Sequence, residues 1–223
     1  MISYLLEPTL TTSEDAQQVG ENLIIAIDGP AGAGKSSVAK ALSAQLNIDR
    51  LDTGSMYRAV AAAALSHSVD LHDFERLVAL SRGLEVTSEG RCLVHGEDVS
   101  HALRDPETNT AVSVVAATSE VRTILVALQR SWARNRSMAG VIEGRDIASV
   151  VFPDARLKIY LTASVEERAR RRSDEGAASI LRRDQVDTSR TASPLVLADG
   201  SRELDTTGRS IADVTSEILS WLQ

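Results

Sequence analysis

Residues 23–36 read Leu-Ile-Ile-Ala-Ile-Asp-Gly-Pro-Ala-Gly-Ala-Gly-Lys-Ser, and this stretch decides the fold. Residues 23–27 are apolar and rich in β-branched side chains, which predicts a buried strand of a parallel sheet. Residues 29–36 match the pattern G-x-x-x-x-G-K-[ST], in which a glycine-rich turn joins a strand to a helix. We therefore expect a helix from residue 35 to about residue 46.

The chemistry of this turn is that of phosphate binding. Glycine lets successive backbone N–H groups face one anion, and the following helix adds the partial positive charge of its N-terminus. Lys35 would bridge the β- and γ-phosphates of ATP, and the Ser36 hydroxyl would bind Mg²⁺. ATP and Mg²⁺ are thus the expected cofactors, and the ATP-binding candidates are Gly29, Pro30, Ala31, Gly32, Ala33, Gly34, Lys35, Ser36 and Ser37.

Composition bounds the class of protein. The chain has 223 residues, of which 43% are hydrophobic and 25% charged, as in an ordinary globular protein of one domain or of one domain with a small second lobe. The longest apolar run, residues 59–65, is far shorter than the roughly 18 residues of a membrane span. No basic residue precedes Lys35, unlike in a secretory signal, and the single Cys92 forms neither an intrachain disulfide nor a zinc site. We expect a cytoplasmic protein without a membrane partner.

The charges are unevenly distributed. A net charge of −7 argues against a nucleic-acid partner, whose protein is usually basic. The basic residues include only three lysines, and residues 130–190 hold twelve arginines and one lysine against nine acidic residues. Such a segment suggests a confined anion site, because a guanidinium group can hold phosphate with two hydrogen bonds. A genome biased towards arginine codons would give the same count.

The remaining chain alternates strands with helices, which predicts a three-layer α/β fold with a parallel sheet. Further strands are expected at 50–52, 141–143 and 157–161, and helices at 57–65, 106–117, 119–135, from Ser164, and from 210 to about 222. Residues 84–87 and 91–95 flank a Ser-Glu-Gly turn and predict an antiparallel hairpin. The expected organisation is a flexible tail at 1–21, a core of 22–66 with 108–172 and 183–223, an inserted lobe at 67–107, and a short lid at 173–182.

Four further stretches narrow the function. They are residues 51–58 (Leu-Asp-Thr-Gly-Ser-Met-Tyr-Arg), 143–147 (Glu-Gly-Arg-Asp-Ile), 150–154 (Val-Val-Phe-Pro-Asp) and 183–194. In this order they resemble the bacterial cytidylate kinases, over about residues 23–222. The resemblance implies a P-loop kinase core, an inserted lobe that binds the nucleoside monophosphate, and transfer of the ATP γ-phosphoryl group to CMP or dCMP.

The resemblance also implies roles for single residues. Arg58, Arg145 and Arg190 would hold the CMP phosphate. The cytosine would contact Ser113, Arg122 and Asp146, the sugar Arg183 and Asp187, and Thr53 would line the acceptor pocket. The residues implied in catalysis are Lys35, Arg145, Asp146 and Arg172.

The chemistry of these residue types agrees with the allocation. Arginines neutralise the charges that meet when phosphoryl moves between two phosphates. The Asp146 carboxylate can accept from the cytosine amino group but not from uracil, a discrimination of ~1–3 kcal/mol. A guanine-reading Asn-Lys-x-Asp sequence does not occur, since the asparagines at 22, 47, 109 and 135 are never followed by lysine, and a GTP switch is therefore disfavoured.

Some features depart from the family or stay open. Only ten residues separate Arg172 from Arg183, and the family's lid is usually longer. Residues 148–149 are Ala-Ser where Gly-Thr is usual. We interpret Asp28 as shaping the turn after the first strand, with a part in the Mg²⁺ shell as the alternative. His67, His72, His95 and His101 are interpreted as surface or lobe residues. The alternatives are a kinase for another small acceptor and a nucleotide-binding module without turnover; by analogy, we expect a monomer.

Overall fold

The structure is a computed structural model and describes residues 22–172, 177–190 and 193–222. Its main sheet has five strands in the order β2-β6-β1-β7-β8, and every pair is parallel. These strands are β1 (Ile24–Asp28), β2 (Arg50–Asp52), β6 (Gly140–Glu143), β7 (Leu157–Thr162) and β8 (Arg202–Asp205). The central strand β1 is buried along its whole length, which confirms the interpretation of its unbroken apolar run.

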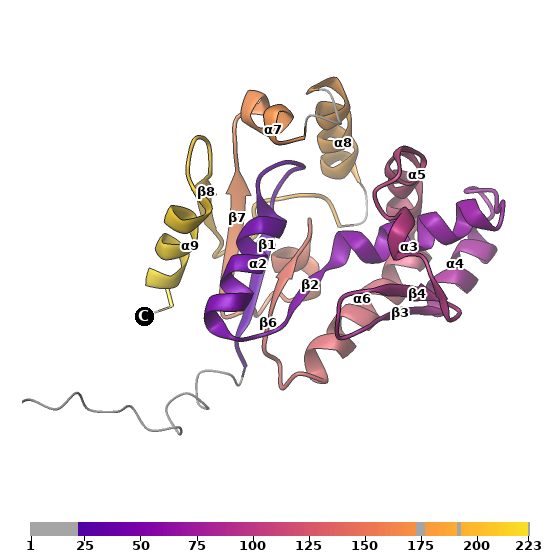
Figure 1. Ribbon diagram of the computed structural model, residues 1–223, viewed down its shortest axis with the longest axis horizontal. Helices are drawn as coiled ribbons and strands as arrows, with labels where there is room; N and C mark the ends of the chain where they lie inside the picture. Colours follow the sequence, from indigo (N-terminus) through magenta and orange to yellow (C-terminus); the bar gives the residue numbers. More distant parts are fainter. Residues whose placement is uncertain (1–21, 173–176, 191–192, 223) are drawn as a thin grey trace, which may run out of the picture.

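Helices cover both faces of this sheet, as Figure 1 shows. On one face, alternate residues of β1, such as Ile25 and Ile27, pack against α2 (Lys35–Leu46) and α9 (Ile211–Ser220). On the other face, Ile24 and Ala26 join a larger cluster with α3 (Thr53–Ser66), α5 (Pro106–Ala117) and α6 (Ser119–Arg134). The expected three-layer α/β architecture is confirmed.

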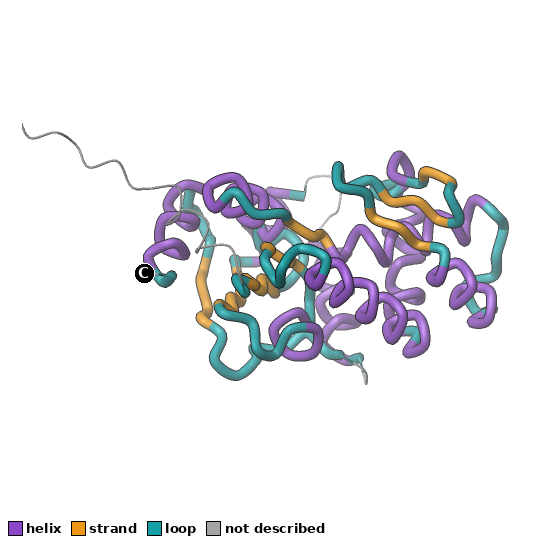
Figure 2. Tube along the Cα trace, turned by 90° about the horizontal axis from the view of Figure 1, so that it is seen from below, coloured by secondary structure: helices purple, strands orange, loops and turns teal. Residues whose placement is uncertain are grey.

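A second, antiparallel sheet consists of β3 (Leu84–Val86), β4 (Cys92–Val94) and β5 (Glu97–Asp98). Leu84 pairs with Val94, so the expected hairpin is confirmed. Figure 2 shows this sheet at the end of the molecule opposite α9, and α4 (Phe74–Arg82) and the 3₁₀ turn η1 (Ser100–Ala102) belong to the same part of the chain. The lobe boundaries 67–107 stay a prediction.

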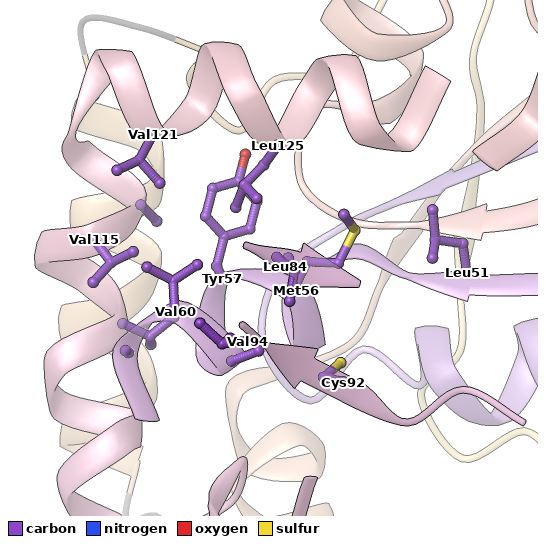
Figure 3. Close-up of a cluster of buried hydrophobic side chains, with 14 of the residues drawn as sticks. Leu51, Met56, Tyr57, Val60, Leu84, Cys92, Val94, Val115, Val121 and Leu125 are labelled. Carbon is purple, nitrogen blue, oxygen red and sulfur yellow. The ribbon is translucent and has the colours of Figure 1, made fainter. Parts of the chain in front are cut away.

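The small sheet shares its hydrophobic core with the main sheet. Figure 3 shows Tyr57 and Val60 of α3 between the α5–α6 pair and the small sheet. The cluster includes Leu51, Met56, Leu84, Cys92, Val94, Val115, Val121 and Leu125, all buried. Because one continuous core joins both parts, α3 fixes the position of the lobe relative to β2.

Strand β8 and helix α4 are among the elements that the sequence analysis did not predict. Strand β8 reads Arg-Glu-Leu-Asp and buries only Leu204, so an edge strand carries almost no apolar pattern. Helix α4 has a visible signal that was not used, since the Asp73 side chain caps it by accepting from the Arg76 N–H.

Helix α8 overlaps the expected lid, whose bounds 173–182 stay a prediction. It spans Ala177–Ser189, so the part of the lid placed at 177–182 is helical and continues into the arginine motif. Residues 173–176 of that lid lie outside the described residues, as does the tail at 1–21. The expected helix starts at Ser164 and Ser210 are confirmed. These serines cap α7 (Val165–Arg171) and α9, because each side chain accepts the N–H three residues on.

Within the described ranges, no single helix is long and apolar enough to cross a membrane, and α5 with α6 passes that test only as a pair bent by 94°. The histidines of the insert are all exposed, as expected.

Candidate functional site

The loop between β1 and α2 needs its glycines. Gly29, Gly32 and Gly34 have φ values of 146°, 79° and 91°, a region that side chains rarely adopt. A Cβ at Gly29 would lie 2.1 Å from the Leu161 carbonyl oxygen, and one at Gly32 would lie 2.9 Å from the Arg168 Cβ. The backbone of this loop can therefore curl at the N-terminus of α2, which is the geometry that receives phosphate.

Lys35 is buried and turned onto its own loop. Its Nζ donates to the carbonyl oxygens of Gly29 and Pro30, both at 2.7 Å. Burial lowers the pKa of Lys35 well below its usual value, and the positive charge of Arg145 lowers it further. The ammonium is thus held in the loop by two carbonyl groups, which a phosphate oxygen can replace.

Ser36 and Glu143 form a pair that fits a magnesium ion. The Ser36 hydroxyl donates to Glu143 Oε2 at 2.7 Å. The buried Oε1 makes no hydrogen bond in the described part of the chain, and its ion-pair partner is Arg50 Nη1 at 3.8 Å. Burial raises the pKa of Glu143 to about 7. A hydroxyl and one carboxylate suit Mg²⁺, which takes its other ligands from phosphate and water.

The sequence analysis quoted Glu143 within a motif but gave it no role. A usable signal was present, because Glu143 ends the strand beside β1 and the carboxyl ends of parallel strands meet at one sheet edge. No group of three or more His, Cys, Asp or Glu residues could hold a metal among the residues described.

Two of the predicted phosphate-binding arginines share one carboxylate. Arg145 Nε donates to Asp187 Oδ2 at 2.7 Å, and Arg190 donates to the other oxygen of the same group. Asp187, expected at the sugar, here lies between the two guanidinium groups. The third arginine, Arg58 of α3, has its Nε 3.5 Å from Asn109 Oδ1.

Two of the three residues expected at the cytosine are in contact. Arg122 and Asp146 form a buried ion pair with an N–O distance of 2.5 Å. Arg122 also donates to the Ala116 carbonyl oxygen at 3.1 Å and lies over the Tyr57 ring, 5.4 Å from its centroid. Ser113 is half-buried on the neighbouring α5.

The other predicted residues have varied surroundings. Thr53 is buried, and its hydroxyl donates to the Glu143 carbonyl oxygen at 2.7 Å, so it ties α3 to the end of β6. Arg172 is half-buried and follows α7 as its C-cap residue. Arg183 lies in α8, and its side chain is outside the described part of the structure.

Helices α7 and α8 supply further contacts to the loop that were not expected. Arg168 donates to the Ala31 carbonyl oxygen at 3.1 Å and pairs with Asp184, whose Oδ1 accepts from the Ala31 N–H at 3.3 Å. Arg171 Nη1 lies 3.4 Å from the Gly32 carbonyl oxygen. The spacing of Arg168 and Arg171 on one face of α7 was a signal for this arrangement.

A parallel α/β sheet, a glycine-rich loop after its central strand, and two arginines on one carboxylate, of which Arg145 acts on the loop lysine, define a P-loop kinase. The family model described as cytidylate kinase matches residues 25–223. The chain therefore belongs to the cytidylate kinase family.

Curated relatives agree with this assignment. The cytidylate kinase of Desulfitobacterium hafniense is 45% identical over 216 residues, covering 90% of this chain and 92% of the relative. That of Pelotomaculum thermopropionicum is 46% identical over 214 residues, covering 88% and 94%. A solved shikimate kinase from Acinetobacter baumannii is 15% identical with a TM-score of 0.48, covering 93% of this chain and 96% of its own.

Proposed function

We propose that this protein transfers the γ-phosphoryl group of ATP to CMP or dCMP, giving ADP and CDP or dCDP. The observation that carries the proposal is the pair Arg145 and Arg190 on one carboxylate, with Arg145 close enough to Lys35 to lower its pKa. Cations of the loop and of the opposite segment converge there, as transfer between two phosphates requires. Membership of the cytidylate kinase family supports a cytosine nucleotide as the acceptor.

The transfer needs no general base. An oxygen of the acceptor phosphate attacks the γ-phosphorus, the bond from that phosphorus to the β-phosphate oxygen breaks, and ADP leaves with the electron pair. The second pKa of a phosphate monoester is near ~6, so the attacking oxygen is already ionised at neutral pH. In this sequence of events Lys35 exchanges its two carbonyl partners for phosphate oxygens, and Arg145 and Arg190 exchange Asp187 for the acceptor phosphate.

When bound, Mg²⁺ neutralises charge on the β- and γ-phosphate oxygens. The residues that would hold it are Ser36, with its hydroxyl, and Glu143, whose Oε1 makes no hydrogen bond in the described residues and lies 3.8 Å from Arg50 Nη1. Their contribution is to keep these oxygens at the start of α2, next to the loop that receives the phosphates.

The remaining assignments complete the proposed site. Asp146 would accept from the cytosine amino group while Arg122 and Ser113 contact the rest of the base edge. Arg58 would join the two phosphate-binding arginines. Thr53 would line the pocket, Arg183 and Asp187 would contact the sugar, and Arg172 would approach the transferred group.

A panel of nucleoside monophosphates tests the proposal. With Mg²⁺ and ATP, we expect fast ADP formation with CMP and dCMP, slower formation with UMP, and negligible formation with AMP and GMP. Equal rates with all acceptors would remove the cytosine assignment and leave a kinase of another specificity. Activity only with a non-phosphorylated acceptor would contradict the role of the paired arginines.

A nucleotide-binding module without turnover is the second candidate, and the short connection between Arg172 and Arg183 favours it. A lid excludes water and completes the charged cage, so a shorter lid could leave binding without transfer. Calorimetry that shows tight binding of CMP and ATP, together with no ADP formation, would support this candidate. We also propose a cytoplasmic monomer that acts on small nucleotides, which sedimentation at several concentrations tests for the oligomeric state.

A further inference from the structure

The segment that carries Arg145 and Asp146 is fixed to the end of β1. The Gly144 N–H donates to the Ile27 carbonyl oxygen at 2.9 Å, immediately before these two residues. Immediately after them begins the π-helical turn η2 (Ile147–Val151), and Asp28 holds its start. The last two residues of β1 therefore hold this segment at both of its ends through hydrogen bonds.

Asp28 accepts these hydrogen bonds with both of its carboxylate oxygens. Oδ1 accepts from the Ile147 N–H at 2.9 Å, and Oδ2 accepts from the Ala148 N–H at 2.7 Å. Asp28 is 1% exposed, and both of these partners are backbone amides. Asp28 therefore contacts a segment far along the chain, which the interpretation of Asp28 as a residue of its own turn did not include.

Such amides are normally capped by their own segment. An aspartate directly before a helical turn usually folds back and accepts from the first free N–H groups. Asp146 stands at that position before η2, yet its side chain makes no such bond. Its carboxylate instead points to Arg122, at 2.5 Å.

Burying the Asp28 carboxylate costs free energy of folding. A buried carboxylate that is held by two backbone amides loses its hydration, and burial accordingly raises the pKa of Asp28 to about 6. The negative charge of Asp146 acts in the same direction, so the two carboxylates repel each other. Conflicts of this kind concentrate at functional sites.

We infer that Asp28 is a positioning residue that caps η2 in place of Asp146 and thereby keeps the Asp146 carboxylate free to recognise the base. Asp28 also directly precedes Gly29, whose carbonyl oxygen binds Lys35, so the same residue sets the register between the phosphate loop and the base-recognition segment. The inference rests on the proposed function, because it assumes that Asp146 contacts the base.

The variant Asp28→Asn tests this role. It keeps the shape of the side chain but presents an NH₂ group to one of the two amides, so Asp146 becomes free to cap η2 itself. We expect the preference for CMP over UMP in kcat/KM to fall ~10-fold and the KM for CMP to rise by a similar factor. The KM for ATP should stay within about twofold, because the phosphate loop is held by its own backbone.

Two controls separate positioning from general destabilisation. Asp73→Asn removes the capping carboxylate of α4, which accepts from the Arg76 N–H at 3.1 Å in the small lobe, and should leave the CMP:UMP preference unchanged. In an Asp146→Asn background, Asp28→Asn should have little further effect on that preference, since the group it protects is gone. Additive losses in the double variant, or equal changes in the KM of both substrates, would overturn the inference.

A measurement on the unmodified protein covers the case in which Asp28→Asn does not fold. The Ile147 and Ala148 amides should exchange their hydrogens as slowly as those of β1, and rapid exchange would contradict the capping role. A failure of the proposed function is distinguishable, because it would show as equal rates with CMP and UMP in the unmodified protein.

Discussion

The phosphate loop and the acceptor side of this molecule are built in different ways. Within the loop, Gly29 to Ser36 are contiguous, and its proposed contacts come mainly from backbone N–H groups at the start of α2. The acceptor side takes single side chains from α3, α6, the segment after β6 and α8. A binding site made of backbone N–H groups is thus fixed by local conformation. A binding site made of side chains depends on how elements far apart in the sequence pack.

The largest expected effect lies on the loop side. Lys35→Ala removes the charge that follows the migrating phosphoryl group, so kcat should fall by ~10²–10³ or more. Lys40→Ala is the matched control, because Lys40 lies on the same helix and is exposed. Steady-state kinetics with saturating ATP and CMP measure both variants, and an unchanged kcat for Lys35→Ala would refute the assigned role.

A smaller loss is expected from the paired arginines. Arg145→Lys keeps the charge but loses the planar guanidinium, and we expect kcat/KM for CMP to fall ~10–100-fold. Arg136→Lys is a suitable control, because Arg136 lies outside the proposed site. Its Nε pairs with the exposed Asp49 at 2.6 Å. If Arg145→Lys has the kinetics of the unmodified protein, the guanidinium does not hold the acceptor phosphate.

The base-recognition residue should change specificity more than rate. Asp146→Asn replaces one acceptor oxygen by a donor, which suits uracil better than cytosine, and the CMP:UMP ratio of kcat/KM should fall ~10-fold. Competition between the two monophosphates measures the ratio directly. A constant ratio would remove Asp146 from base recognition while leaving its ion pair with Arg122 as a structural contact.

The smallest expected effect is on the free energy of unfolding and comes from Glu143, which lies between the phosphate loop and the acceptor side. Its pKa is raised from 4.5 to about 7 in the folded protein, so the folded state binds more protons than the unfolded state between these values. The contribution of Glu143 to stability therefore decreases as the pH rises from about 4.5 to about 7. Glu143→Gln should be more stable than the unmodified protein at pH above ~7, by on the order of 1 kcal/mol, and lose this advantage at low pH.

Urea unfolding at several pH values measures this difference. Mg²⁺ with ADP should then stabilise the unmodified protein more than Glu143→Gln, because the ion favours the charged carboxylate. Equal stabilisation of the two proteins by the magnesium nucleotide would separate Glu143 from the metal site.

The fold was predictable from the sequence where neighbouring residues form a strong local pattern. The apolar run before Gly29, the capping serines at 164 and 210, and the hairpin turn near Gly90 each specify an element through nearby residues. Strand β8 was missed because an edge strand with one buried residue shows no such pattern. Helix α8 was not predicted because its polar sequence offers no apolar period.

The candidate site divides in the same way. By itself, the sequence determined the phosphate loop, because the φ angles of its glycines and the helix that follows depend on residues only a few positions apart. Only the tertiary structure decided that Asp28 caps a turn 119 residues away, that Asp187 joins Arg145 across 42 residues, and that Ser36 meets Glu143 across 107. The Asp28 and Ser36 contacts follow from the order of strands in the sheet, which brings the ends of β1 and β6 together. The Asp187 contact follows from the packing of α8, and no local pattern of residues specifies either arrangement.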